Sequence, residues 1–196
     1  MPVPDLPLLT FADAAALEAW LAAQPASSPG AWLRFAKKGA PEATVSKSDA
    51  VDSALAHGWI DGQLGKVDEA YFKTRFTPRR PRSIWSQVNR ERVERLIAAG
   101  QMTPAGLREV EAAKADGRWD AAYPSPSKAE APDDWLAALD ARPEARTLWE
   151  ALDGANRYAV LHRLHNASAR ARPSMLMRLA DMLARGETIH PRRGAK

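Results

Sequence analysis

The chain has 196 residues, a formal net charge of +4 and a hydrophobic content of 45%. A chain of this length and composition can bury a core as one domain, or as one domain with a small appendage. It contains no cysteine, which excludes disulfides, thiolate metal sites and cysteine nucleophiles. The chain opens without a basic targeting segment and has no apolar run of roughly 18–20 residues. We therefore expect a soluble cytoplasmic protein without membrane insertion.

The first 77 residues predict a mixture of helices and strands. Helical periodicity and alternating polarity predict, in chain order, a helix over 10–25, a strand over 31–38, a helix over 46–58 and an antiparallel hairpin formed by 59–63 and 69–77. Thr10 and Ser46 are the expected caps of the two helices. We expect the turn of the hairpin at Gly62–Gly65.

The rest of the chain predicts helices only. Ser83 is expected to cap a helix over 83–100, and Pro104 is expected to open the next, over 103–117. The segment YPSPSKAEAP, residues 123–132, contains three prolines and predicts a linker. Four further helices are predicted beyond it, in the segments DDWLAALDA, PEARTLWEALDG, NRYAVLHRLHNAS and PSMLMRLADMLARG.

Together these elements predict an α+β fold. A small antiparallel sheet with flanking helices is expected in a domain over residues 1–122, which carries a basic and aromatic face. The linker over 123–132 then leads to a helical C-terminal region over 133–190.

Positive charge is concentrated in one short stretch of the chain. Residues 71–95 contain eight basic and two acidic side chains, whereas residues 1–70 contain five basic and nine acidic ones. A local excess of one charge is a better indication of a binding surface than the overall charge.

Four arginines precede the expected helix start at Ser83: Arg75, Arg79, Arg80 and Arg82. A cation near a helix N-terminus is unfavourable by roughly 0.3–1 kcal/mol, so these side chains need negative partners. One hypothesis is internal pairing with the acidic side chains of the preceding hairpin, Asp61, Asp68 and Glu69. The other is an external phosphate or carboxylate, held by guanidinium groups and helix amides. A purely solvated charged face is the third possibility.

Asp61 and the aromatic residues around it have two interpretations each. Asp61 precedes Gly62 and is either a turn residue or a carboxylate that lines a pocket and orients a ligand or moves a proton. It is the one weak catalytic candidate. The aromatic side chains either belong to the core or stack on a flat ligand; they are Trp32, Phe35, Trp59, Tyr71, Phe72, Phe76 and Trp85.

Other motifs argue against common enzyme classes. His162 and His165 are spaced as metal ligands on a helix, but no nearby carboxylate or cysteine completes a set, so we expect no metal site. The sequence lacks G-x-G-x-x-G, Walker A, H-E-x-x-H and G-x-S-x-G motifs. We expect no cofactor.

Several segments together resemble the YdeI/OmpD-associated family of bacterial proteins. They are GWIDGQ, RFTPRRPRSIWSQVN, AGLREVEAAKADGRWDAAY, and ANRYAVLHRLHNAS with the later MLARGETIHP. The resemblance extends from roughly Trp32 to Pro191. It implies a link to bacteriocin protection and to stress or envelope phenotypes, and it implies no particular biochemical activity.

The leading hypothesis is a binding module for an anionic ligand or an acidic protein surface, centred on residues 59–85. One alternative is an enzyme for a small acidic or phosphorylated substrate, with Asp61 as proton carrier and Arg79 and Arg80 as clamps. Another is a protein-interaction module that uses the C-terminal helices. Nucleic acid ranks second among partners, because the acidic first 70 residues would repel a phosphate backbone. The sequence leaves the oligomeric state open.

Overall fold

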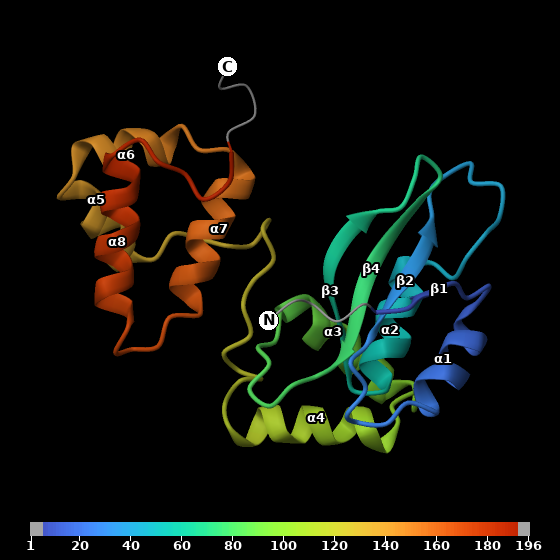
Figure 1. Ribbon diagram of the computed structural model, residues 1–196. Helices are drawn as coiled ribbons and strands as arrows, with labels where there is room; N and C mark the ends of the chain where they lie inside the picture. Colours follow the sequence, from blue (N-terminus) through green and yellow to red (C-terminus); the bar gives the residue numbers. More distant parts are fainter. Residues whose placement is uncertain (1–5, 192–196) are drawn as a thin grey trace. The chain divides into compact units, whose positions relative to one another are not determined.

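A computed structural model describes residues 6–191, and the chain divides into two compact units between Ala122 and Tyr123 (Figure 1). The first unit combines a sheet with helices, and the second is built from helices. The predicted α+β fold with a helical C-terminal region is confirmed.

The sheet of the first unit has four strands, in the order β1-β2-β4-β3. Their bounds are Leu8–Leu9 for β1, Ala31–Ala36 for β2, Trp59–Lys66 for β3 and Tyr71–Pro78 for β4. The pairs β2–β4 and β3–β4 are antiparallel, as the alternating polarity predicts, whereas β1 pairs in parallel with β2. The sheet is therefore mixed, because a two-residue strand that the sequence pattern does not mark is added at its edge.

The β3–β4 hairpin is confirmed, but its turn lies later than predicted. The carboxylate of Asp68 accepts hydrogen bonds from the amides of Ala70 and Tyr71, both at 2.8 Å. An aspartate that bonds the backbone two and three residues ahead stabilises a turn without requiring glycine. Gly62–Gly65 lies within β3, where the register shifts between Asp61 and Leu64. The prediction of a turn at these glycines is wrong.

Each helix of the first unit begins at a side-chain cap. The helices are α1 (Ala14–Ala22), α2 (Lys47–Ala56), α3 (Gln87–Ala98) and α4 (Pro104–Ala115). Their caps each accept a hydrogen bond from the amide three residues ahead, and they are Asp13, Ser46, Ser86 and Thr103. The cap of α2 is as predicted, whereas Asp13 replaces Thr10 and Ser86 replaces Ser83.

The core of the first unit lies on one face of the sheet. Side chains from all four helices pack there against alternate strand positions; examples are Leu17, Leu55, Val93, Val110, Leu33, Phe35 and Phe76. Successive residues of a strand point to opposite faces. The intervening positions of β2 and β4 therefore lie on the other face of the sheet, which we call the outer face.

The second unit packs its helices around a core that contains two tryptophans. The helices are α5 (Asp133–Asp140), α6 (Pro143–Glu150), α7 (Gly154–His165) and α8 (Arg172–Ala184). Trp135 and Trp149 meet edge to face at 5.5 Å between ring centroids, surrounded by leucines from all four helices. Across residues 6–191, no helix combines the length and the apolarity that crossing a bilayer would require.

Candidate anion-binding face

The register of β2 and β4 gathers basic and aromatic side chains on the outer face. Trp32 is paired with Arg75, Arg34 with Lys73, and Ala36 with Tyr71. Residues directly opposite each other in an antiparallel pair lie on the same face, with Cβ atoms about 4.5–5.5 Å apart. We call this group the sheet-face cluster: Trp32, Arg34, Tyr71, Lys73 and Arg75.

Aromatic rings hold two of the cations in place. The Nζ of Lys73 lies 4.7 Å from the ring centroid of Trp32, and the Cζ of Arg34 lies 4.4 Å from that of Tyr71. Such contacts are attractive because the ring face is negative. The hydroxyl of Tyr71 accepts from the amide of Glu42 at 3.2 Å and is 3.3 Å from its carbonyl oxygen, to which it donates. The Glu42 carboxylate also lies 3.5 Å from Arg34.

The positive charges of Lys73 and Arg75 are not neutralised by any acidic side chain that the structure describes. Lys73 and Arg75 form no ion pair with any residue in the range 6–191. The Nε of Arg75 is buried and has no hydrogen-bond partner in the same range. A buried donor without an acceptor costs about 1–3 kcal/mol. The cluster is therefore an electropositive surface that still lacks an acceptor.

Lys73 has room on this face because Gly65 lies opposite it on β3. A Cβ atom at Gly65 would come within 3.2 Å of the Lys73 side chain. The missing side chain therefore leaves space for the aliphatic part of Lys73.

Arg79, a predicted site residue, is buried and stabilises the loop in which it lies. Only 7% of the residue is exposed, and its guanidinium stacks 3.5 Å from the ring centroid of Trp85. Its Nη1 donates to the carbonyl of Ile84 at 3.4 Å, and its amide donates to the carbonyl of Gly58 at 2.9 Å. These contacts fix the segment that leaves the sheet after Pro78.

Arg80 and Arg82 are exposed on the same loop, which we call the arginine loop (residues 79–83). Ser83 closes a turn here: its Oγ accepts from the Arg80 amide at 3.1 Å, and its own amide donates to the Arg80 carbonyl. Because the Ser83 hydroxyl is used in this turn, the cap of α3 falls to Ser86, and the prediction of a helix start at Ser83 is wrong.

The backbone of Arg82 has a φ of 67°. This left-handed conformation costs a non-glycine residue about 1 kcal/mol or more. The Arg118 side chain helps to hold it by donating to the Ser83 carbonyl at 2.8 Å. The hydrogen bond from Arg118 lowers the pKa of Asp116, and the charge of Arg82 lowers it further. Within residues 6–191, neither Arg80 nor Arg82 forms an ion pair.

The acidic residues of the hairpin have partners other than the arginines. Asp61 is paired with Phe76 on the core side of the sheet, and its carboxylate lies 3.4 Å from Lys47. Glu69 forms an ion pair with Lys66, and Asp68 bonds its own turn. The structure therefore separates Asp61 from Tyr71 and Arg75, which lie on the outer face.

Trp59 is buried in the core, edge to face with Trp20 at 5.4 Å. It lines an open groove of about 500 Å³ in which Arg79 also takes part, together with His57 and Arg108. Trp85 is likewise buried, edge to face with Trp119. The predicted site residues are thus divided among the outer face, the arginine loop and the core.

Sequence reasoning missed Arg34 and Lys73 as members of the sheet-face cluster, and it named Trp32 only among the aromatic side chains that could stack on a ligand. Their signal is the alternation in AWLRFAKK and YFKTRFT, which places each of them on the side of its strand away from the core. The pairing of the two strands had to be known before the three could be assigned to one surface.

The structural role of Arg79 leads to a stability prediction. Arg79→Ala is expected to lower the free energy of unfolding by about 1–3 kcal/mol, because it uncovers Trp85 and removes the packed side chain. Arg80→Ala, at an exposed position on the same loop, should change it by less than about 0.5 kcal/mol. Urea unfolding followed by circular dichroism measures both; equal midpoints for the two variants would contradict the structural role.

The two parts of the chain match different protein families. Residues 9–109 match the family described as "Domain of unknown function (DUF8412)". Residues 128–186 match the family described as "Bacteriocin-protection, YdeI or OmpD-Associated". The second match confirms the resemblance to this family over residues 128–186, in the second unit. The three resembling segments between residues 58 and 123 lie outside that match, so the expected extent from Trp32 is not confirmed. No curated protein and no solved structure matches the chain.

Proposed function

We propose that this chain, which belongs to the DUF8412 family and carries a YdeI/OmpD-associated region over residues 128–186, is a binding protein that captures an anionic partner on the outer face of its sheet. The match of residues 128–186 to a bacteriocin-protection family supports a protection-related role.

One observation carries the proposal: Arg34 stands directly opposite Lys73, with Arg75 two residues further along β4. Like charges directly opposite in a sheet are destabilising, by a fraction of a kcal/mol up to about 1 kcal/mol. The fold nevertheless keeps them together and positions them with aromatic rings. An anion bound on this face would relieve the repulsion.

The chemistry of the cluster defines the class of partner. Guanidinium groups bind carboxylates and phosphates through paired hydrogen bonds, and Lys73 adds a point charge. Successive outward positions of one strand are about 6.6 Å apart, so Lys73 and Arg75 together suit a partner with more than one anionic group. Arg80 and Arg82 offer such a partner a second pair of exposed cations. Asp61 pairs with Lys47, so the geometry gives the enzyme hypothesis no comparable support.

The test is titration of the full chain with poly-L-glutamate, followed by fluorescence anisotropy at low ionic strength. Binding is expected, and it should weaken as salt screens the charges. Lys73→Glu with Arg75→Glu should reduce the affinity at least tenfold, since the double change reverses the two unpaired cations. Arg80→Glu with Arg82→Glu should have a smaller effect, because no aromatic ring among residues 6–191 contacts those side chains.

The matched control is Arg95→Glu with Arg108→Glu, which makes the same change in net charge at exposed positions on α3 and α4. It should preserve most of the binding. Equal losses in the control and in the cluster variant would show that only net charge matters, and absence of binding at low salt would refute the proposal.

A further inference from the structure

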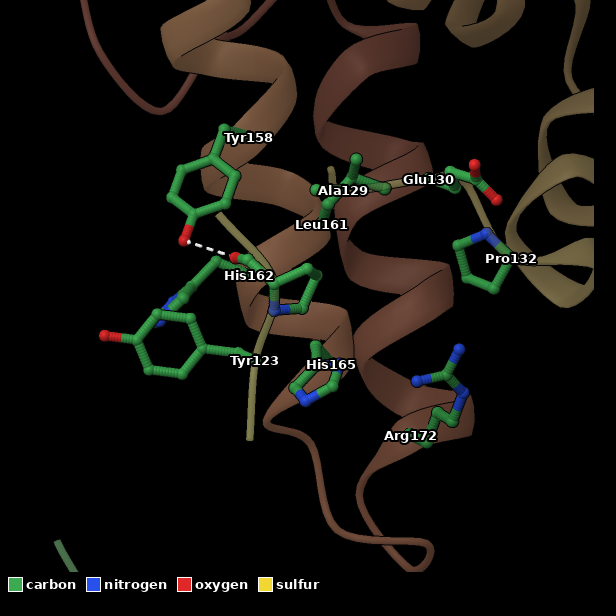
Figure 2. A pocket seen from close by; sticks show the side chains of 10 residues that line it. Tyr123, Ala129, Glu130, Pro132, Tyr158, Leu161, His162, His165 and Arg172 are labelled. Carbon is green, nitrogen blue, oxygen red and sulfur yellow. Dashed lines mark hydrogen bonds between the residues drawn. The ribbon is translucent and has the colours of Figure 1, made fainter. Parts of the chain in front are cut away.

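The second unit contains a pocket between α7 and the segment before α5 (Figure 2). One face of α7 contributes Tyr158, Leu161, His162 and His165, which recur at the three- and four-residue spacing of a single helix face. The facing wall comes from the segment that begins at Tyr123. The pocket has a volume of about 180 Å³.

Aromatic contacts shape this pocket and hold the segment against the helix. The ring of Tyr123 meets His162 edge to face at 4.6 Å, and Tyr158 lies 5.8 Å from the same imidazole. The Tyr158 hydroxyl donates to the carbonyl oxygen of Pro124 at 3.1 Å, the bond drawn in Figure 2. The walls are therefore built before any ligand enters.

The guanidinium of Arg172, which lines the pocket, is already paired with a carboxylate. Arg172 donates from Nε and Nη2 to the carboxylate of Asp134, at 2.5 and 2.8 Å, and from Nη1 to the carbonyl of Leu164 at 2.6 Å. The same contact lowers the pKa of Asp134. Glu130, at the rim, is exposed and negative. An anionic ligand would thus find no unused cation here and would meet a carboxylate.

His162 offers the pocket a hydrogen-bonding group on α7. Within residues 6–191, neither ring nitrogen of His162 has a hydrogen-bond partner. Burial lowers the pKa of His162, and the nearby His165 and Arg163 lower it further, so the imidazole is neutral at pH 7. A neutral imidazole presents one donor and one acceptor.

We propose that this pocket binds a small, flat, uncharged aromatic molecule that carries a hydroxyl or a ring N–H for hydrogen bonding to His162. An apolar cavity of about 150 Å³ is large enough for benzene, so the volume here suits a single ring with one or two substituents. The rings of Tyr123 and Tyr158 supply edge and face contacts to such a ligand. This site lies in the second unit and does not depend on the anion-binding proposal for the first.

The experiment is a titration of the full ¹⁵N-labelled chain with phenol, benzene and benzoate, followed by amide chemical shifts. Phenol should produce saturable shifts in α7 and in residues 123–132, and it should bind at least tenfold more tightly than benzoate. Benzene should bind more weakly than phenol, because it lacks the hydroxyl. Equal affinities for phenol and benzoate, or shifts that do not saturate, would overturn the proposal.

His162→Phe tests the hydrogen bond while preserving an aromatic side chain. In this variant the preference for phenol over benzene should disappear, whereas benzene itself should bind as it does to the unsubstituted chain. An unchanged affinity for benzene would therefore show that the pocket of the variant is intact. A variant that retains the full preference for phenol would show that His162 does not contact the ligand.

Discussion

Replacement of Trp135 by alanine is expected to unfold most of the second unit. Trp135 has no exposed surface and packs edge to face against Trp149. In residues 6–191 its indole N–H has no acceptor, so packing accounts for its contribution. A Trp→Ala change in a core costs about 3–5 kcal/mol. A core of fewer than about 80 residues rarely contributes more than about 3–5 kcal/mol in total.

Amide chemical shifts of the full chain provide the measurement. The signals of α5–α8 should lose their dispersion in Trp135→Ala, while the signals of the β2–β4 sheet should persist if the two units fold independently. Met177→Ala is the matched control in the same unit, since Met177 is 57% exposed, and it should cost less than about 0.5 kcal/mol. A well-dispersed second unit in Trp135→Ala would contradict the prediction.

The second large effect is expected from Gly106→Ala in the first turn of α4. A Cβ atom at this position would lie 2.2 Å from the carbonyl oxygen of Ala56, at the end of α2, and 2.8 Å from the Met102 side chain. The amide and hydroxyl of Thr103 donate to that same carbonyl oxygen, at 3.0 and 2.7 Å. The backbones therefore cannot separate without breaking these bonds. We expect a loss of about 3 kcal/mol or more, at the upper end of the cost of overpacking.

Gly154→Ala is the control for this change, because Gly154 also lies in the first turn of a helix. A Cβ atom there would meet nothing within 4 Å. The substitution should be neutral or should stabilise α7 by up to about 1 kcal/mol, since alanine is the better helix former. Urea unfolding of both variants measures the difference. A midpoint for Gly106→Ala equal to that of Gly154→Ala would show that the contact with Ala56 is not rigid.

The parts of the fold that were predictable depend on local information. Ser46 caps α2 through the amide three residues ahead, and Pro104 opens α4, because both effects involve residues within one helical turn. Alternating polarity likewise indicates β2 and the β3–β4 hairpin. Where two candidate helix caps lie close together in the chain, as Ser83 and Ser86 do, the sequence pattern does not show which of them caps the helix. Each hydroxyl accepts from an amide three residues away, Ser83 from the preceding Arg80 and Ser86 from the following Asn89.

The candidate sites depend on pairing between distant segments. Trp32 and Lys73 become neighbours only through the register of β2 and β4, and no spacing along the chain contains that register. The pocket of the second unit has the same origin. The prolines and serines of residues 123–132 predict a linker, whereas the bond from Tyr158 to Pro124 requires α7 to be in place. Charge concentration directs attention to residues 71–95, but the register decides which of its arginines reach the outer face.

The irregularity of β3 has a consequence for self-association. With the strand order β1-β2-β4-β3, this strand forms one edge of the sheet. A regular edge strand is a template on which a second chain can add, and proteins that lack protection there polymerise into fibres. The register shift between Asp61 and Leu64 interrupts the ladder at mid-strand; Gly62 lies within the interruption and Gly65 follows it. The irregular stretch that contains Gly62, where a turn was expected, thus makes this edge a poor template for the addition of a second chain.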